Sequence, residues 1–599
     1  MGARHPALLP LLPLLAGALR LESAAVAHAS HASHASRASH ASHVAAVLAW
    51  QGHVAGAPCD PAFEVCVTKF ADELPLPPVA KMTRVVDPET GAPVDELELV
   101  MAPCEAALHS ELPPTRLFCY GGSFPGPTIE ATTGVEVRAR FVNQLPAKHL
   151  LPVDESVCGG VPPGGRAAVH LHGGHQAWES DGDAYAWWTA AGEAGPDAPA
   201  DPGAYRWANT RAAAPLFYHD HAACVTRLNV WAGLSGVYNL RDAGGAPAAG
   251  CGGVSEFPLV LRDVALAADA SLAYPPELVP EMFGNLSLVN GALWPRHTVP
   301  GGPVAYRLLN AANARFYSLQ LFLVDPATGE ADLSQPGPAW VVTGADGGVL
   351  PSGPATVKGR LVVAPAERFD VTVDFAGWEG ARLILHNDAA TPYAGPGGDP
   401  AAGVPLPSVM AFDVNPARAV PRAGAEAPCP PAAAPPPRAV VRAPPVALER
   451  RIEMSESTDD AGRLLLLLEG RRCDDPITAT PTLGSEELWE FINTTPDYHP
   501  MHMHLVAFTI EGFTPFDVAQ YLATGDLVYT GDTVPPEAHE AGPRDMVKVP
   551  VGMTARVRMT FDREGLYMFH CASCALRRRG ARAGRAGAGW GRTCHDYCR

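Results

Sequence analysis

The sequence has few charged residues and lacks an excess of basic ones. Asp, Glu, Lys and Arg make up 18% of the 599 residues, whereas apolar residues make up 47%, which is a globular composition. The net charge of −19 argues against a surface that binds nucleic acid, because such a surface must neutralise phosphates. No apolar run reaches the ~18 residues that a membrane span requires. We therefore expect no nucleic-acid partner and no integral membrane span.

Long stretches with helical periodicity are also missing. Short runs of alternating polar and apolar residues, such as residues 135–142, are instead separated by glycine and proline. Together with the chain length, this pattern predicts an all-β protein of three sandwich-sized domains at residues 67–242, 253–414 and 447–571. A linker rich in proline and alanine, at residues 415–446, separates the last two domains.

The amino terminus is typical of an exported protein. Arg4 precedes an apolar segment at residues 7–19, and Ala25-Val26-Ala27 offers a small-x-small cleavage site. We interpret residues 1–27 as a signal peptide and expect a secreted, extracellular protein. An organelle transit peptide is the alternative, because the next stretch is also rich in alanine and serine. Since exported chains commonly form disulfides, the 13 cysteines predict some disulfide bonds.

A repetitive segment follows the predicted signal peptide. Residues 28–43 are His-Ala-Ser triplets with too few apolar side chains to build a core, so we expect residues 28–66 to be disordered. Histidine-rich tracts can collect metal loosely, but slippage in repetitive DNA explains the triplets more simply. We assign no catalytic role to this segment.

Eight of the 22 histidines lie in four tight clusters. On a β-strand the side chains of residues i and i+2 point to the same face, so each His-x-His motif gives two adjacent imidazoles. Pairs that converge from different strands could surround a group of metal ions, since imidazole binds copper, zinc, iron and nickel. The three pairs are His170 and His172, His219 and His221, and His502 and His504.

The fourth cluster is a neighbouring histidine and cysteine. On a strand His570 and Cys571 would face opposite sides, so one can serve a metal cluster while the other serves a separate metal behind it. A thiolate combined with imidazole indicates a blue-copper electron-transfer centre. Because His499 stands an odd number of residues from His502, we place it with Cys571 at this second centre.

Each motif also has a purely structural interpretation. A single His-x-His motif is more often structural or exposed, and three histidines alone could form a catalytic zinc site. A zinc site would need neither four clusters nor a His-Cys dipeptide. The four clusters together therefore indicate metal sites.

Several further motifs accompany the histidines. They are Phe70–Pro75, Leu112–Leu117, Phe124–Thr128, Ser180–Gly182, Thr226–Val230, Leu288–Gly291 and Ala364–Asp370. With the histidine clusters they cover most of the chain between Lys69 and Cys571. On these motifs the sequence resembles the multicopper oxidases, and most closely their bacterial spore-coat laccase and bilirubin oxidase branch.

The resemblance implies three cupredoxin-like Greek-key β-sandwich domains and four copper ions. A type 1 copper would take single electrons from a reducing substrate, and a trinuclear cluster between the first and third domains would reduce O2 to water. By motif, His170 and His502 would bind type 2 copper, and His499 and Cys571 would bind type 1 copper. The type 3 pair would be bound by His172, His219, His221, His504 and His570.

The resemblance also implies an acid and the partners of the reaction. Asp181 matches an acid that assists proton delivery near the cluster, although a residue before Gly182 would by default be an ordinary turn residue. The partners would be O2 and a small-molecule reducing substrate, which is a phenol, an aromatic amine or a bilirubin-like pigment. We expect the protein to be a monomer.

The C-terminal segment departs from the family pattern. Past the cysteine, the family continues with a histidine, a second histidine and a methionine, where this sequence has Ala572, Leu576 and Ala581. The chain thus supplies eight of the family's ten copper histidines, and its type 1 and type 3 sites lack ligands. The composition of residues 572–599 becomes rich in arginine inside the motif. This abrupt change indicates a misread splice site, a retained intron or a frameshift rather than a native basic tail.

Two alternatives to a laccase-like oxidase stay open. A metal-ion oxidase acting on Fe(II), Cu(I) or Mn(II) would place carboxylates or methionines near type 1 copper, and Glu511, Asp517 and Met503 are candidates by their sequence position. A catalytically impaired copper-binding protein is favoured if the C-terminal sequence is native.

Overall fold

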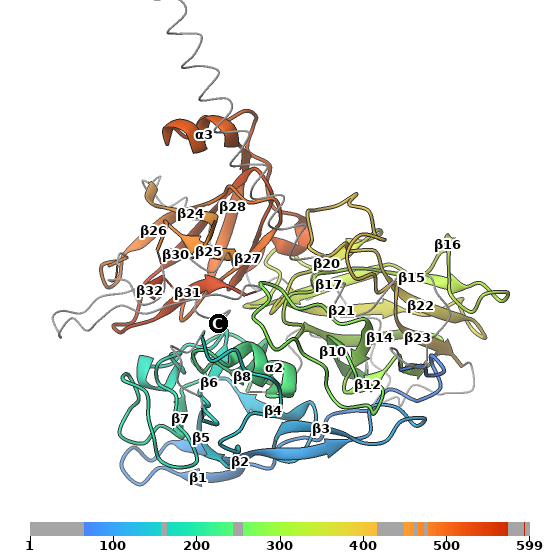
Figure 1. Ribbon diagram of the computed structural model, residues 1–599, viewed down its shortest axis with the longest axis horizontal. Coiled ribbons are helices and arrows are strands. Elements are labelled where there is room, and N and C mark those ends of the chain that lie inside the picture. The colour runs from blue at the N-terminus through green and yellow to red at the C-terminus, as the bar shows by residue number, and fades with distance from the viewer. Residues whose placement is uncertain are drawn as a thin grey trace, which may run out of the picture.

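The computed structural model is almost entirely β, with three groups of strands that follow one another along the chain (Figure 1). The residues it describes are 65–156, 164–243, 255–415, 448–459, 464–471, 477, 479–572 and 592–593. The predicted signal peptide, nearly all of the repetitive segment and the linker, and nearly all of the arginine-rich tail lie outside the described residues. The all-β prediction is confirmed.

The first group of strands forms two sheets that pack through aromatic rings. Its strands are β1 (Thr83–Val86), β2 (Pro93–Ala106), β3 (Thr115–Tyr120), β4 (Gly126–Thr132), β5 (Glu136–Asn143), β6 (Val169–His172), β7 (Ala204–Trp207), β8 (Ala214–Asp220) and β9 (Ser235–Arg241). One sheet has the order β1-β2-β5-β7 with β3 also paired to β2, and the other has the order β4-β9-β8-β6. Between them Tyr120 contacts Phe141 and Tyr218, with ring centroids 5.6 and 5.0 Å apart. The strand predicted over residues 135–142 is observed as β5.

The second group also forms two sheets. Its strands are β10 (Glu256–Val264), β11 (Leu286–Val289), β12 (Ala292–Leu293), β13 (Arg296–Val299), β14 (Pro303–Asn310), β15 (Tyr317–Val324), β16 (Ala331–Pro336), β17 (Trp340–Ala345), β18 (Gly348–Val349), β19 (Ala355–Val357), β20 (Leu361–Val363), β21 (Arg368–Asp374), β22 (Arg382–Asn387) and β23 (Ser408–Val414). The sheets have the orders β12-β11-β10-β14-β21-β17-β18 and β13-β23-β22-β15-β16. The rings of Tyr306 and Phe412, 5.8 Å apart, join them.

The third group repeats the arrangement. Its strands are β24 (Leu448–Thr458), β25 (Leu464–Leu468), β26 (Glu486–Asn493), β27 (His499–Met503), β28 (Phe508–Pro515), β29 (Met546–Val549), β30 (Met553–Thr560), β31 (Met568–Cys571) and β32 (Arg592–Thr593). The sheets have the orders β25-β24-β26-β30-β28 and β29-β27-β31-β32. Trp489 and Phe569 pack between them with ring centroids 5.3 Å apart.

The three groups share one feature of their topology. In each group one long strand pairs in parallel with a later strand, β2 with β5, β10 with β14, and β24 with β26, while most other pairs are antiparallel. Three sandwiches built in the same way agree with the predicted cupredoxin-like fold. The residue limits given above for the three domains stay a prediction.

Helices are few and short in the described part of the chain. They are η1 (Trp178–Ser180), α2 (Thr226–Ala232), α3 (Val518–Thr524) and η2 (Ala538–Glu540). In that part of the chain no helix has the length and hydrophobicity that a bilayer crossing demands.

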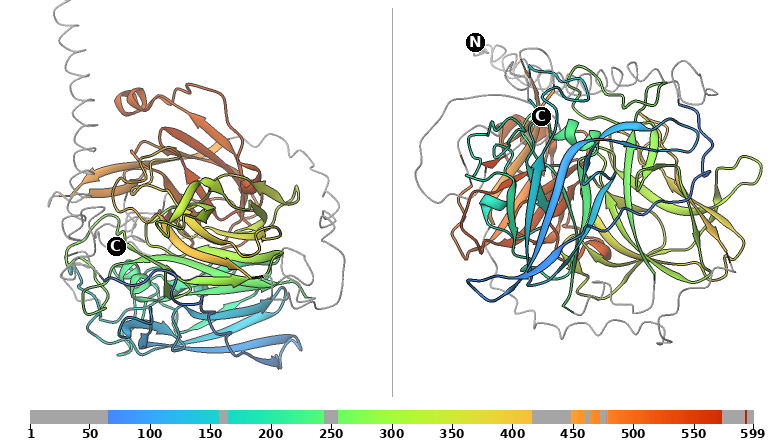
Figure 2. Two further views of the ribbon diagram at one scale, coloured as in Figure 1. Left: turned by 90° about the vertical axis from the view of Figure 1, so that its right-hand side faces the viewer. Right: turned by 90° about the horizontal axis from the view of Figure 1, so that it is seen from below.

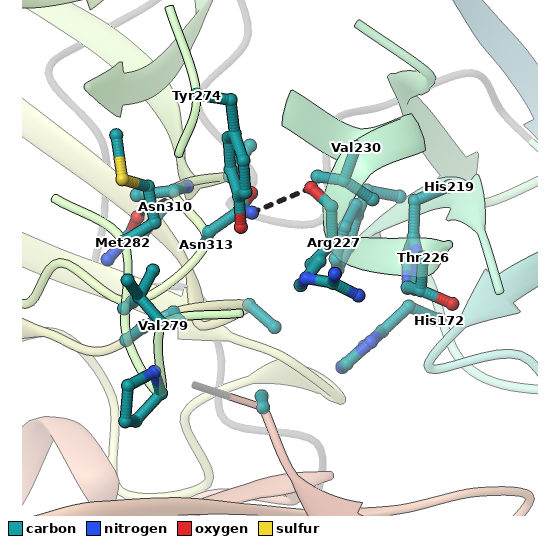
Figure 3. A pocket seen from close by; sticks show the side chains of 18 residues that line it. His172, His219, Thr226, Arg227, Val230, Tyr274, Val279, Met282, Asn310 and Asn313 are labelled. Atoms are coloured by element: carbon teal, nitrogen blue, oxygen red, sulfur yellow. Dashed lines mark hydrogen bonds between the residues drawn. The ribbon is translucent and has the colours of Figure 1, made fainter. Parts of the chain in front are cut away.

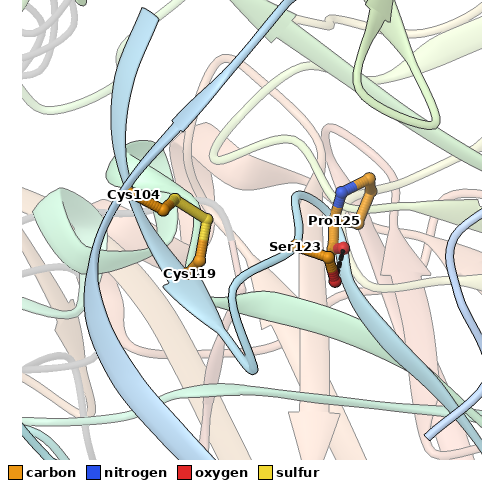
Figure 4. The surroundings of a disulfide bond; sticks show 4 residues. All are labelled: Cys104, Cys119, Ser123 and Pro125. Atoms are coloured by element: carbon orange, nitrogen blue, oxygen red, sulfur yellow. Dashed lines mark hydrogen bonds between the residues drawn. A yellow bond between two sulfur atoms is a disulfide. The ribbon is translucent and has the colours of Figure 1, made fainter.

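A disulfide bond joins two neighbouring strands of the first group. Cys104 on β2 and Cys119 on β3 are bonded, with Cα atoms 5.9 Å apart (Figure 4). Closing a loop of this length stabilises a protein by about 3 kcal/mol, chiefly by restricting the unfolded chain. Just beyond β3, the hydroxyl of Ser123 donates a hydrogen bond to the carbonyl oxygen of Pro125 at 3.0 Å.

The first and third groups face one another across a seam, with the second group beside both (Figures 1 and 2). One hydrophobic core runs continuously through the first two groups, whereas the third has its own core, which Leu278 of the second group joins. Strands β6 and β8 approach the seam from one side, and β27 and β31 approach it from the other. This seam brings the predicted metal ligands together.

Candidate metal centre

Seven buried histidines meet at the seam between the first and third groups of strands. The antiparallel pairing of β6 with β8 sets His170 opposite His219, and that of β27 with β31 sets His502 opposite His570. His172 ends β6, and two further histidines follow β8 and β27 directly. Each of the seven is at most 2% exposed. We call this set the histidine cluster: His170, His172, His219, His221, His502, His504 and His570.

Imidazoles from the two sides of the seam stack on one another. The ring centroids of His172 and His502 are 3.6 Å apart, and those of His170 and His504 are 3.9 Å apart. These rings come from distant parts of the chain, so only the packing of the first group against the third could bring them together.

Three nitrogens of the cluster have no hydrogen-bond partner among the described residues. They are Nε2 of His170, Nδ1 of His172 and Nε2 of His502, and these three residues offer ligand atoms within 4.8 Å of one another. The second nitrogen of each ring donates a hydrogen bond: His170 Nδ1 to the Asp181 carbonyl at 2.5 Å, His172 Nε2 to the Asp545 carboxylate at 3.2 Å, and His502 Nδ1 to the Asp545 carbonyl at 2.9 Å. A buried polar atom without a partner costs about 1–3 kcal/mol. A metal ion at this position would satisfy all three.

A second triad lies beside the first. His221, His504 and His570 also offer ligand atoms within 4.8 Å of one another. His504 Nε2 and His570 Nε2 are 3.1 Å apart, although the other nitrogen of each ring donates elsewhere, to Asp181 and to the Cys571 carbonyl. Two nitrogen lone pairs that face each other at this distance repel unless a cation lies between or beside them. The residues present therefore fit a cluster of metal ions.

Burial keeps the imidazoles in the form that binds metal. Burial, together with the charges of neighbouring histidines, lowers the pKa of His170, His219 and His504 to about 3. The pKa values of His172 and His502 lie well below the usual value for the same reason. Neutral imidazole is the protonation state that a metal ion requires.

Asp181 contacts the cluster through its carbonyl oxygen, which accepts from His170, and through its carboxylate. Its Oδ2 accepts a hydrogen bond from His504 Nδ1 at 2.7 Å, and its Oδ1 accepts one from Gln176 Nε2 at 2.7 Å. Burial raises the pKa of this carboxyl to about 6, although His170 and the bond from Gln176 act in the opposite direction. The carboxyl can therefore gain and lose a proton near neutral pH while it holds His504.

His219 lies on the side of the cluster where the sequence departs from the family pattern. His172 and His219, with ring centroids 5.8 Å apart, line a cavity of about 70 Å³ (Figure 3). Ala572 lines the same cavity, and its backbone nitrogen donates to the Pro500 carbonyl at 2.8 Å, which continues the pairing of β31 with β27. Position 572 follows His570 by two residues and so belongs to the same face of the strand. The alanine leaves this corner without a third nitrogen among the described residues.

On the other face of β31, a sulfur and a nitrogen form a separate site, which we call the sulfur site. Cys571 Sγ lies 3.5 Å from His499 Nδ1, and both residues are buried. His499 Nε2 is hydrogen-bonded to the hydroxyl of Thr495 at 2.7 Å, a contact that the sequence analysis missed. Leu576 and Ala581, which replace the family's other type 1 ligands, lie outside the described residues. The sulfur site thus has two ligand atoms in the described part of the chain.

Carboxylates surround the sulfur site, and sequence reasoning did not identify them. Asp497 Oδ1 is 3.6 Å from His499 Nε2. Glu281, from the second group, is half-buried with its Oε2 atom enclosed, and no hydrogen bond reaches that atom from the described residues. Burial raises the pKa of Glu281 well above its usual value, and the charges of Asp497 and Cys571 raise it further, so these groups are neighbours. Burial alone would lower the pKa of His499, but Asp497 and Cys571 raise it to about 10.

The three residues suggested for a metal-ion donor have ordinary structural contacts. Glu511 accepts a hydrogen bond from Arg558 at 2.9 Å on the surface, and Asp517 accepts one from the Gln520 amide at the start of α3. Met503 is fully buried in the core of the third group.

An arginine from the second group supports the histidine cluster. Arg368, 1% exposed, holds the Asp545 carboxylate with two hydrogen bonds of 2.7 and 2.6 Å and donates to the Pro215 carbonyl at 3.0 Å. Asp545 in turn accepts from His172, so Arg368 orients a predicted ligand through one intermediate residue. Gly173 lies against this ion pair at φ +84°, and a Cβ there would come within 2.6 Å of both side chains. Only glycine leaves room for the ion pair. The motif Ala364–Asp370 contains Arg368, but nothing in its sequence indicated this contact.

The ion pairs continue beyond Asp545 to a buried lysine. Lys548 Nζ lies 2.7 and 3.0 Å from the two Glu367 carboxylate oxygens and 2.7 Å from Glu540 Oε1. Burial alone would raise the pKa of Glu540, but Lys548, His539 and Arg544 lower it to about 2. A carboxyl whose pKa falls on folding stabilises the protein above its unfolded pKa of about 4.5, and this contribution is lost as the pH falls toward 2.

We therefore expect Glu540→Gln to flatten the acid side of the stability profile. Between pH 6 and pH 3, the free energy of unfolding of the parent should fall by on the order of 2 kcal/mol more than that of the variant. Urea unfolding at a series of pH values measures this difference. Glu179→Gln, which changes an exposed glutamate, is the control and should keep the parent's slope. Equal slopes in the parent and the Glu540→Gln variant would contradict the assignment.

The chain is similar to known oxidases over most of its length. A family model described as multicopper oxidase matches residues 443–574. A laccase of Bacillus subtilis is 35% identical over 527 residues, covering 84% of this chain and 95% of that protein. Multicopper oxidase LPR1 homolog 1 of rice (Oryza sativa subsp. japonica) is 34% identical over 510 residues, covering 77% of this chain and 83% of that protein. Among solved structures, a laccase from Pediococcus acidilactici shares the fold, with a TM-score of 0.62 at 21% identity over 85% of this chain and 92% of that chain.

Proposed function

The chain belongs to the multicopper oxidase family, and we propose that it is a laccase-like oxidase, which couples the one-electron oxidation of small organic donors to the reduction of O2 to water. The observation that carries the proposal is the histidine cluster. Seven buried imidazoles converge there, and three of their nitrogens have no hydrogen-bond partner among the described residues. Copper ions bound there would supply the store of single electrons that O2 reduction needs. Donors of this class are phenols, aromatic amines and bilirubin-like pigments.

The seven histidines of the cluster would hold three copper ions. His170 and His502 would hold type 2 copper, and His221, His504 and His570 would hold one type 3 copper. His172 and His219 would hold the other type 3 copper, and here the ligand set is one nitrogen short. The triad of His221, His504 and His570 supports the second of these assignments, and the proximity of His172 and His219 supports the third.

Asp181 would manage protons beside the cluster. The Asp181 carboxyl can take up and release a proton near neutral pH, because burial raises its pKa to about 6, and its Oδ2 also accepts the hydrogen bond from His504 Nδ1. A general acid works best when its pKa lies near the working pH. The same bond orients the His504 ring, so Asp181 would serve both as a proton carrier and as a support for a ligand.

The sulfur site does not fit a complete blue-copper centre in the described residues. His499 and Cys571 offer one nitrogen and one sulfur, whereas such a centre takes two histidines and a cysteine with a weak axial ligand. We therefore derive no step through this site. The shortage of ligands supports the alternative of a catalytically impaired copper-binding protein, which copper analysis separates from an active oxidase.

The experiment combines copper analysis with O2 consumption. The purified full chain is loaded with copper, and O2 uptake is followed with a phenolic donor. The proposal expects close to four copper ions per chain and four donors oxidised per O2, with no hydrogen peroxide. Two or fewer copper ions without O2 uptake would indicate a binding protein. Full copper loading without O2 uptake would contradict the oxidase.

A second candidate function is the oxidation of a metal ion, which the carboxylates beside the sulfur site favour. Glu281 and Asp497 would offer carboxylate oxygens to a divalent cation near His499 and Cys571, and the cation would replace the proton that burial favours on Glu281. We expect Glu281→Gln to lower the ratio of kcat/KM for Fe(II) to kcat/KM for a phenol by about tenfold, or ~1.4 kcal/mol. Glu511→Gln, which changes an exposed carboxylate that binds Arg558, is the control and should leave the ratio unchanged. An unchanged ratio in Glu281→Gln would remove the metal-ion alternative.

We also propose that the protein is exported. The composition of residues 1–27 supports this, as does the disulfide between Cys104 and Cys119, since such bonds persist in oxidising compartments.

A further inference from the structure

A cavity beside the histidine cluster contains a positive charge without a negative counterpart among the described residues. The cavity measures about 70 Å³ and lies between α2, the segments 279–282 and 310–314, and the end of β31 (Figure 3). None of its 18 lining residues is acidic. The charged residue among them is Arg227, whose guanidinium is turned into the cavity with His172 and His219 nearby.

Arg227 lacks the partners that a buried arginine normally has. It is 7% exposed, its Nη1 donates to the Cys224 carbonyl at 2.8 Å, and its Nε has no hydrogen-bond partner among the described residues. No carboxylate of the described chain forms an ion pair with it. Arginine is almost never buried unless it is paired, because removing the charge from water costs several kcal/mol.

The surrounding polar groups cannot replace a counter-ion. The side-chain Oδ1 of Asn313 is buried without a partner as well, while its Nδ2 donates to the Arg227 carbonyl at 2.8 Å. A buried, unsatisfied cationic donor in a cavity larger than one water molecule indicates a ligand.

We propose that this cavity binds a small monovalent anion, of the size of a halide, formate or bicarbonate, through the Nε–H of Arg227. The volume admits a halide or a three- to four-atom anion. The proposal goes beyond the oxidase function and does not depend on it, because the charge imbalance exists without any metal. An anion in this position would lie beside His172 and His219.

The test uses the full-length protein without metal and bromide as the probe. Sodium bromide is titrated at constant ionic strength against sodium gluconate, whose bulky anion serves as the reference, and the unfolding temperature is measured. Since a ligand that binds only the folded state stabilises it by mass action, we expect a rise in unfolding temperature that saturates with bromide. In crystals soaked in bromide, an anomalous peak should lie in the cavity beside Arg227.

Matched variants separate the cavity from general salt effects. Arg227→Gln should lose the saturable rise, and Arg227→Lys should keep part of it. Arg166→Gln removes a nearby arginine that contacts the Cys224 sulfur from outside the cavity, and it should keep the full rise. Ala572→Val fills part of the cavity while leaving Arg227 intact, so it should weaken the rise even if Arg227→Gln does not fold.

Two results would overturn the proposal. One is a parent protein with neither a saturable rise nor a bromide peak in the cavity. The other is a rise of equal size in Ala572→Val or Arg227→Gln. Because copper is absent throughout, a failure of the oxidase proposal would not affect either result.

Discussion

The His504→Ala variant is expected to lose copper from the histidine cluster and to consume O2 at less than about one thousandth of the parent rate. His504 stacks on His170 at 3.9 Å, faces His570 at 3.1 Å and is held by Asp181 at 2.7 Å, so one substitution removes contacts to both triads. Loss of a residue that merely supports a metal ligand costs about 10–100-fold, and loss of the ligand itself should cost more. Copper content per chain and O2 uptake measure the effect.

A buried histidine outside the cluster provides the control. His297 is 5% exposed and packs against Phe257 with ring centroids 4.7 Å apart, far from the predicted ligands. His297→Gln should lower stability without changing copper content. If His504→Ala retained full copper and full O2 uptake, the histidine cluster would not be the site of O2 reduction.

The reverse change, Ala572→His, is expected to increase the copper that the chain retains after dialysis and to raise O2 consumption by about tenfold or more. Position 572 lies on the same face of the strand as His570 and lines the cavity that His172 and His219 share. A histidine there would add a nitrogen to the one pair of the cluster that lacks a third ligand. Because metal affinity rises steeply with ligand number, this pair should then retain copper during dialysis.

Ala572→Phe is the matched control, because it fills the same cavity with a ring that has no nitrogen. It should gain neither copper nor activity. Equal behaviour of the histidine and phenylalanine variants would show that position 572 does not face a metal. An active parent with four tightly bound copper ions would show instead that the chain supplies the missing ligand from elsewhere.

Local periodicity was sufficient to predict much of the site. Because strand side chains alternate, the His-x-His motifs predicted pairs of imidazoles on one face, and the dipeptide of His570 and Cys571 predicted two sites on opposite faces of one strand. The structure has both features, on β6, β8, β27 and β31. The all-β class followed in the same way from short alternating runs between glycine and proline.

Contacts between distant segments could not be predicted from the sequence. Arg368, Asp545 and Glu281 have no local pattern that distinguishes them from ordinary surface charges, and their importance arises only when the second group packs against the seam. Arg227 likewise looks like a polar residue of a short helix. That Arg227 has no acidic neighbour in the cavity follows only from the three-dimensional structure, which shows the residues around it.

The ion pair of Arg368 with Asp545 gives the middle third of the chain more than a spacer's role. The middle sandwich contributes no histidine to the cluster. The guanidinium of its Arg368 nevertheless bridges a carbonyl from the first sandwich and a carboxylate from the third. A shortened enzyme that joined only the two outer sandwiches would keep every predicted copper ligand and still lose the brace that aligns His172. Miniaturised versions of this oxidase would therefore have to rebuild that brace before they could assemble their metals.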